Sequence, residues 1–196
     1  IGSLDRPPDR SVNRERGLWI GILAAGGAAL QALEGFIPQP VPGIKPGIAN
    51  VMTLLALYGF GSRAAIEVAG IRSVLGGVAL GTLLTPSFLL SLAGGLSAAA
   101  VMGGLVRLGA ADPTGEPRRS SLLLGVVGVS LAGAAAHVLA QIGLVYGLLV
   151  THPGVFLVLP ALLLSALATG LLTGLAARRA LARLRYNGVV FTKEGV

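Results

Sequence analysis

The sequence predicts an all-α membrane protein, a bundle of six transmembrane helices with both termini in the cytoplasm. Of its 196 residues, 54% are hydrophobic and only 12% are charged, and the mean hydropathy is +0.82. About a quarter of the residues in a typical soluble domain are charged, so this chain cannot cover a water-facing surface. No charged residue occurs from Ser73 to Val106 or from Ser120 to Ala177. Because a membrane-spanning helix needs about 20 apolar residues, these two stretches alone hold three or more spans.

Proline, glycine and charged residues divide the apolar sequence into six predicted helices. These spans are Leu18–Ile37, Gly47–Phe60, Ala64–Leu84, Ser87–Val106, Ser121–Leu149 and Val155–Ala177. The second is short for a complete crossing, and the fifth is long enough to tilt or to bend. Four prolines between the first two spans predict a stiff, extended loop, because proline fixes φ and disfavours helix at the preceding residue. A loop containing Asp112, Pro113 and Pro117 separates the first four helices from the last two.

Basic residues orient the bundle. The side that carries both termini holds Arg6, Arg10, Arg14, Arg16, Arg63, Arg107, Arg118, Arg119, Arg178, Arg179, Arg183, Arg185 and Lys193. The opposite loops contain only Lys45, and Arg72 lies within a span. Because cytoplasmic loops carry an excess of Lys and Arg, we expect both termini to be cytoplasmic. The predicted organisation is a cytoplasmic segment over residues 1–17, a membrane domain over 18–177 and a basic tail over 178–196, in a prokaryotic cell membrane.

Small residues recur at four-residue spacing in the predicted helices. The first span is the richest, with Ala24 and Ala28 on one line and Ala25 and Ala29 on the next. Such pairs allow helix backbones to approach closely in lipid. Packing within the bundle is the more common use of these pairs, and docking of another membrane subunit is the alternative. We predict that these four alanines form a docking surface.

Arg72 is the most informative polar residue of the predicted spans. It lies nine residues after Arg63, about 13 Å of helix rise, which places it near the middle of the bilayer. An ionisable residue there costs about 2.5–3.5 kcal/mol on insertion scales and therefore needs a partner or a function. Glu67 is on the same helix but about 140° around its axis, so it is poorly placed to pair with Arg72 directly.

Other polar residues fall in the outer half of the predicted bundle. Gln31, Thr53 and Ser91 lie there beside the predicted ligand-binding residues, which are Glu34, Lys45, Asn50, Arg72, Ser87, His137 and Gln141. Interfacial solvation is an equally simple explanation for Glu34 and Lys45. Hydrogen bonding between helices explains His137 and Gln141 at least as well as ligand binding. A structural bridge from Arg72 to Glu34 or Glu67 is also open.

The sequence excludes several classes of chemistry. There is no cysteine, so thiolate metal sites, cysteine nucleophiles and disulfides are excluded. The phosphate-cradling loop of ATPases is absent, and the three aspartates do not form the cluster that would hold Mg²⁺ on a diphosphate. We expect no catalysis by this chain alone, no cofactor, no metal site and no nucleic-acid partner. A removable secretory signal is not expected either, because the first apolar run lacks a small-residue cleavage site.

Three stretches of the sequence resemble the Gx transporter family, which is also catalogued as heptaprenyl diphosphate synthase component I. They are Pro42–Asn50 (PGIKPGIAN), Ile71-Arg72, and Thr85–Gly95 (TPSFLLSLAGG). A Lys-x-Gly-x-Ala-Asn run, a mid-helix Arg and a Pro-Ser-Phe helix start occur together, which makes the pattern specific. The resemblance extends well over about Ala28 to Val106.

The family is in turn similar to the substrate-binding S components of energy-coupling-factor transporters. This resemblance implies six helices, a small vitamin-like or amphiphilic anionic ligand taken from the outer side, and docking through the first helix. The implied partners are a membrane T subunit and two cytoplasmic ATPases. The leading hypothesis is therefore the substrate-binding subunit of an uptake transporter.

Two other functions are open. The alternative from a different class is a membrane accessory subunit of polyprenyl diphosphate or quinone biosynthesis, using the basic residues Arg118, Arg119 and Arg178 to Arg185. Their ordinary role as positive-inside signals is the simpler explanation. The last hypothesis is a proton-coupled carrier that uses Glu67 and His137, although the halves of the chain show no repeat of the kind such carriers usually have.

Overall fold

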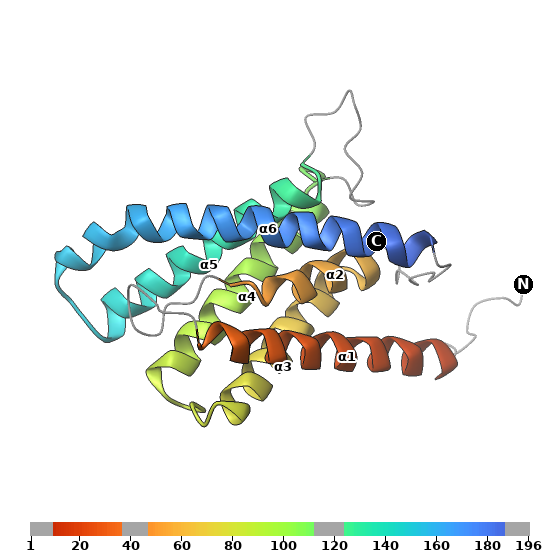
Figure 1. Cartoon of the computed structure of the whole chain (residues 1–196), viewed down its shortest axis with the longest axis horizontal. Coiled ribbons are helices and arrows are strands. Elements are labelled where there is room, and N and C mark those ends of the chain that lie inside the picture. The colour runs from red at the N-terminus through yellow and green to blue at the C-terminus, as the bar shows by residue number, and fades with distance from the viewer. Residues whose placement is uncertain (1–9, 37–46, 112–123, 187–196) are drawn as a thin grey trace, which may run out of the picture.

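The protein is a bundle of six α-helices (Figure 1) in a computed structural model that describes residues 10–36, 47–111 and 124–186. The helices are α1 (Arg10–Glu34), α2 (Asn50–Phe60), α3 (Ser62–Ala79), α4 (Pro86–Arg107), α5 (Val126–Leu148) and α6 (Leu159–Tyr186), and the short 3₁₀ helix η1 (Pro153–Val158) precedes α6. The described residues contain no β-strand, only an isolated bridge between Ala111 and Leu124. The predicted all-helical architecture is confirmed.

The protein is a helical membrane protein by the length and apolarity of its helices. Four segments are long and apolar enough to cross a membrane: Arg14–Glu34, Pro86–Arg107, Val126–Leu148 and Pro153–Arg185. The apolar helix α2 is shorter, with 11 residues, and α3 carries three charged residues within its 18. The N-terminal end of α1 and the C-terminal end of α6 lie at the same end of the molecule (Figure 1), as an even number of crossings requires. Because only four segments meet the length and apolarity of a span among the described residues, six crossings with cytoplasmic termini stay a prediction.

Several helix boundaries differ from the predicted ones. Helix α1 begins at Arg10 and α6 continues to Tyr186, so both helices extend into the segments predicted to be cytoplasmic. The α6 extension consists mainly of the helix formers Ala, Leu and Arg, and the α1 extension is rich in Arg, so both helices continue past the predicted membrane surface. Helix α3 ends at Ala79 rather than Leu84, because Gly81 and Leu84 both adopt positive φ values, +64° and +63°.

Helix α2 occupies the centre of the bundle. Helices α1, α3, α4, α5 and α6 form a row in which each contacts the next, and α2 contacts all five. Figure 1 shows α2 between α1 and α6, which do not touch each other. Nine of the eleven α2 residues are buried. A polar side chain on α2 therefore meets protein rather than lipid.

Glycines set the closest helix contacts. A Cβ atom on Gly170 of α6 would lie 2.8 Å from the Cβ atom of Ala134, and one on Gly174 would lie 2.9 Å from the Cα atom of Val127. These two glycines therefore allow the backbones of α5 and α6 to meet, as the spacing of small residues predicts for packing within the bundle. In the same seam, the Ser130 hydroxyl donates to the carbonyl oxygen of Gly170 at 2.7 Å.

Candidate functional site

Arg72 joins three helices inside the bundle. It lies on α3 and is only 2% exposed. Its Nη1 donates to Oε1 of Gln31 on α1 at 3.3 Å, and its Nη2 donates to Oδ1 of Asn50 on α2 at 2.7 Å. Both acceptors are neutral amides. The guanidinium is thus oriented by hydrogen bonds that leave its positive charge uncompensated by the groups that hold it.

The two acidic residues considered as partners of Arg72 have other hydrogen bonds. Glu67 accepts from Arg16 Nη2 at 3.4 Å and from Arg63 Nε at 3.2 Å, so a bridge from Arg72 to Glu67 does not form. Oε1 of Glu34 accepts from the backbone N–H of Ala49 at 2.9 Å. Glu34 forms no salt bridge with Arg72 but is near enough to interact with it electrostatically.

Glycines on three helices make room for this arrangement. A Cβ atom on Gly27 of α1 would lie 2.8 Å from Cδ of Arg72, and one on Gly95 of α4 would lie 3.0 Å from its Nη2. On α3, a Cβ atom on Gly76 would lie 2.6 Å from Nε2 of Gln31. Any larger residue at these positions would displace the side chains that surround the guanidinium, so the local sequence is fitted to a buried arginine.

His137 closes the group from α5. A Cβ atom on Gly94 would lie 2.8 Å from Cε1 and Nε2 of the imidazole ring, so the ring packs directly against α4. A Cβ atom on Gly47 would lie 3.6 Å from the ring and 3.1 Å from Nδ2 of Asn50. Gly47 has a φ of +83°, which an L side chain rarely adopts. The turn before α2 therefore passes close to the side chains of both Asn50 and His137 at Gly47.

Several buried polar atoms on the helices that surround Arg72 have no well-formed hydrogen bond with a described residue. They belong to one set of side chains, here called the polar cluster: Gln31, Glu34, Asn50, Thr53, Arg72, Ser91, His137 and Gln141. The atoms are Thr53 Oγ1, Arg72 Nε, Ser91 Oγ, both ring nitrogens of His137, and Gln141 Oε1. Leaving a buried polar group unsatisfied costs about 1–3 kcal/mol, so such a concentration of these groups needs an explanation.

The structure brings together most of the predicted ligand-binding residues. Glu34, Asn50, Arg72, His137 and Gln141 are all buried and belong to the polar cluster. Thr53 lies three residues after Asn50 on α2, and Ser91 lies three residues before Gly94, which contacts His137, on α4. This spacing places each pair on one face of its helix. Gln31 is likewise three residues before Glu34, which is the signal that could have added it to the predicted set.

Two predicted residues do not join the polar cluster. Ser87 is half-buried in the first turn of α4 and makes no side-chain hydrogen bond within the described residues. This turn follows the cap at Thr85, whose hydroxyl accepts from the N–H of Phe88. Lys45 lies outside the described residues.

The predicted docking alanines of α1 divide into two pairs. Ala24 and Ala28 are buried, whereas Ala25 and Ala29 are exposed. Adjacent residues of a helix point about 100° apart, so one line of alanine can face the bundle while the next faces outward. Ala24 and Ala28 therefore pack within the bundle, and only the line of Ala25 and Ala29 is available to a partner.

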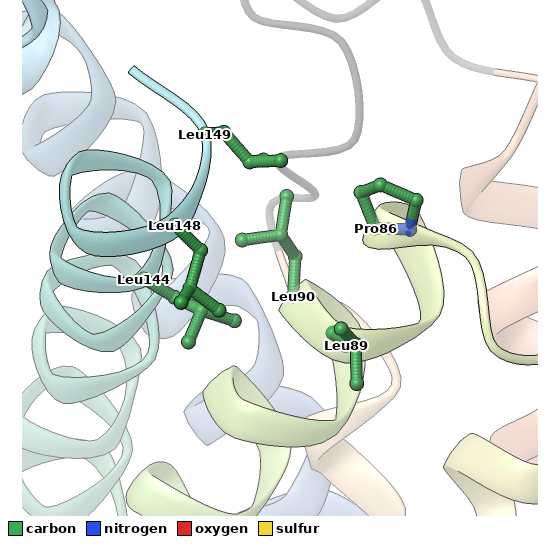
Figure 2. A pocket seen from close by; sticks show the side chains of 6 residues that line it. All are labelled: Pro86, Leu89, Leu90, Leu144, Leu148 and Leu149. Atoms are coloured by element: carbon green, nitrogen blue, oxygen red, sulfur yellow. The ribbon is translucent and has the colours of Figure 1, made fainter. Parts of the chain in front are cut away.

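An apolar pocket lies between α4 and α5 (Figure 2). Its volume is about 60 Å³, and it is lined by Pro86, Leu89, Leu90, Leu144, Leu148 and Leu149. No member of the polar cluster lines it. However, the backbone carbonyl oxygen of Leu90 accepts a hydrogen bond from Nε2 of Gln141 at 3.4 Å. The pocket and the polar cluster are thus direct neighbours.

Comparison with known families decides the family of this chain. A family model described as heptaprenyl diphosphate synthase component I matches residues 23–180. The chain belongs to this family. The resemblance predicted from Pro42–Asn50, Arg72 and Thr85–Gly95 is confirmed at this level. The match to heptaprenyl diphosphate synthase component I includes every member of the polar cluster and all of the pocket. No curated protein and no solved structure matches the chain.

Proposed function

We propose that the chain is the substrate-binding subunit of an uptake transporter and that it captures a small anionic ligand at the polar cluster. The observation that carries this proposal is the buried Arg72: among the described residues its Nε has no hydrogen-bond partner and its other hydrogen bonds go to neutral amides. Glu34 interacts with the guanidinium only electrostatically, and a ligand with an anionic group would supply the direct charge-assisted hydrogen bond to an anion that Arg72 lacks among the described residues. Thr53, Ser91, His137 and Gln141 offer the additional donors and acceptors that fix its orientation.

The energetics favour a ligand over a purely structural role. Charged residues inside a membrane protein are costly and usually mark a pathway, a relay or a ligand counter-ion. A structural cluster recovers that cost when all its groups are satisfied, whereas a half-satisfied buried network is worse than an apolar core. A charge-assisted hydrogen bond to an anion is worth about 1.5–3 kcal/mol. Ligand binding therefore recovers energy that the unliganded bundle forgoes.

An uptake subunit of this kind needs an energising partner, which we propose to be a membrane T subunit with cytoplasmic ATPases. Helix α1 supports this proposal because it lies at the end of the helix row and contacts only α2 and α3 among the described helices. Its outward face exposes Gly21, Ala25 and Ala29 at four-residue spacing. Such a line of small residues permits close approach of a partner helix in lipid.

The family description favours a second candidate function. It names a component of a prenyl diphosphate synthase, so the chain would serve as a membrane accessory subunit while a soluble second component performs the chemistry. The end of α6 would supply the contact, because Arg178, Arg179, Arg183 and Arg185 are exposed there. Among the described residues, no group of three or more His, Cys, Asp or Glu residues could hold a metal ion. Mg²⁺ for the diphosphate would then come with the partner.

Native mass spectrometry tests the two functions against each other. The tagged protein is purified from its own membranes in mild detergent, beside an Arg72→Met variant and an Arg63→Met control. Arg63 is a suitable control because it is on the same helix but exposed, and it pairs with Glu67. We expect a bound small anion, a T subunit and ATPases, with the anion lost only from Arg72→Met. Recovery of a soluble prenyl synthase without ATPases would establish the second function instead.

A further inference from the structure

The polar cluster and the apolar pocket follow one face of α5. His137, Gln141, Leu144 and Leu148 are spaced by four, three and four residues, which places them along one side of the helix. The first two are buried and polar, and the last two line the pocket. From Gln141 to Leu148 the helix rises about 10 Å. The face therefore changes from polar to apolar over roughly the length of a short hydrocarbon chain.

Helix α4 presents the same change in the opposite chain direction. Gly94 packs against His137, the carbonyl of Leu90 binds Gln141, and Pro86 with Leu89 lines the pocket. Leu90 belongs to both features, because its side chain lines the pocket while its carbonyl oxygen accepts from Gln141. Leu90 thus lies between the pocket and the polar cluster in the seam between α4 and α5.

The pocket opens at its outer end and is closed at its inner end. Leu148 is 65% exposed and Leu149 is half exposed, whereas Leu90 is only 2% exposed. Figure 2 shows the side chains of Leu144 and Leu148 on α5 facing Leu90 on α4, with Leu149 beyond the end of α5. The exposed rim is entirely apolar and sits on helices that are long enough to cross a membrane. Because the rim lies at the first residue of α4 and the last residue of α5, it is expected at the edge of the hydrocarbon layer.

We infer that the ligand is a single-chain amphiphile, whose anionic head binds the polar cluster and whose hydrocarbon chain lies in the pocket between α4 and α5. This inference rests on the proposed function and specifies its substrate class. A head near Arg72 and His137 would satisfy the orphaned polar groups, and a chain directed along the seam would end at Leu148. Such a ligand would reach the site laterally from the bilayer.

Photolabelling in lipid nanodiscs tests this inference by locating the chain directly. Two probes share an octyl chain with a diazirine near its end, one with a phosphate head and one with a carboxylate head. We compare the native protein with Arg72→Met, with Leu144→Trp, which fills the pocket, and with Leu139→Trp. The last is a matched control, because Leu139 is on the same helix, 50% exposed and outside the pocket.

The expected result is that at least one probe labels the pocket residues Leu89, Leu144, Leu148 or Leu149. That labelling should fall by about tenfold or more in Arg72→Met, the effect of losing one charge-assisted hydrogen bond to the head. Leu144→Trp should reduce it similarly, and Leu139→Trp should leave it unchanged. An excess of butyl phosphate or butyrate should compete with the matching probe, because the head alone binds the polar cluster.

Two results would overturn the inference. Pocket labelling that Arg72→Met does not reduce would mean that the pocket holds only an ordinary lipid chain. Labelling by both probes that is spread over lipid-facing leucines such as Leu164 would mean that the pocket holds no probe chain at all. In either case, a native anion lost from Arg72→Met in mass spectrometry would still support the proposed function. A native anion retained by Arg72→Met would contradict both proposals.

Discussion

Two groups of polar side chains are buried between the helices, and they differ in how well their hydrogen bonds are satisfied. In the seam between α5 and α6, Ser130 donates to the carbonyl of Gly170 at 2.7 Å and lies 2.9 Å from the hydroxyl oxygen of Thr173. Thr173 donates to the same carbonyl at 3.1 Å. In the polar cluster, by contrast, polar atoms of five side chains lack a well-formed partner within the described residues.

Burial alone does not distinguish polar side chains that pack helices together from those proposed to bind a ligand, whereas the number of satisfied hydrogen bonds does. Ser130 and Ser91 are almost equally buried, at 3% and 5% exposed. In lipid, a satisfied hydroxyl holds two helices together. An unsatisfied hydroxyl beside a buried cation has a cost that only a ligand or a further partner can offset. We therefore interpret the seam between α5 and α6 as packing and the polar cluster as the proposed binding site.

Removing the cation of the polar cluster should have the largest effect. Arg72→Met should weaken binding of the native anion by about 10- to 100-fold, equivalent to a charge-assisted hydrogen bond of 1.5–3 kcal/mol. The free energy of unfolding should change little. Relief of the insertion cost of arginine, about 2.5–3.5 kcal/mol, offsets the loss of a donor to Gln31 and Asn50, about 1–3 kcal/mol for each buried acceptor.

Binding titrations and reversible unfolding in detergent or bicelles measure the two quantities separately. Arg63→Met is the control, since it removes a charge from the exposed end of the same helix. A variant that unfolds much more easily yet retains its affinity per folded molecule would show that Arg72 is structural. The polar cluster would then be equivalent to the seam between α5 and α6.

Adding one methyl group at a glycine should affect stability in one region and ligand affinity in the other. Gly174→Ala places a Cβ atom 2.9 Å from the backbone of Val127, whereas Gly94→Ala places it 2.8 Å from the side chain of His137. A backbone cannot yield without separating the helices, so Gly174→Ala should destabilise the fold by about 1–3 kcal/mol. Gly94→Ala should instead displace the imidazole, reducing ligand affinity more than stability.

This pair of variants is internally controlled, because both exchange glycine for alanine within a helix. The gain in helix propensity, about 1 kcal/mol, is the same for each and cancels in the comparison. Affinity and unfolding free energy are measured for both proteins. An equal loss of stability in the two variants would mean that the ring of His137 is packed as rigidly as the backbone of α5.

Much of this fold could be predicted because lipid imposes strong rules on sequence. Charge-free apolar stretches predict helices, and α4, α5 and α6 occupy the expected regions. Arg72 could be selected as a site residue because an arginine inside a span is costly wherever it points. Glu34, Asn50, His137 and Gln141 could be added because each is polar and falls at a similar predicted depth.

The remaining features depend on helix rotation and on contacts between distant segments. Hydropathy does not specify which line of alanines on α1 faces inward, and the structure buries Ala24 while exposing Ala25. Nor does hydropathy show that Glu67 pairs with Arg16, because the two residues lie on different helices and are 51 positions apart in the sequence. Ser91 and Ser130 look alike in the sequence, because each is a serine within an apolar helix. Only their neighbours distinguish a binding group from a packing group.

The smallest predicted effect tests that distinction directly, by deleting one hydroxyl from each region. Ser130→Ala removes the donor to Gly170 and the partner of Thr173, so the unfolding free energy should fall by about 0.6–1.7 kcal/mol, the range for such bonds in membranes. Ser91→Ala removes a hydroxyl with no partner among the described residues. It should leave stability unchanged or slightly higher, because the buried polar group no longer has to be desolvated, and should weaken ligand binding several-fold. Unfolding and binding assays on both variants check this, and the reverse pattern, with Ser91→Ala destabilising and Ser130→Ala neutral, would exchange the roles assigned to the two regions.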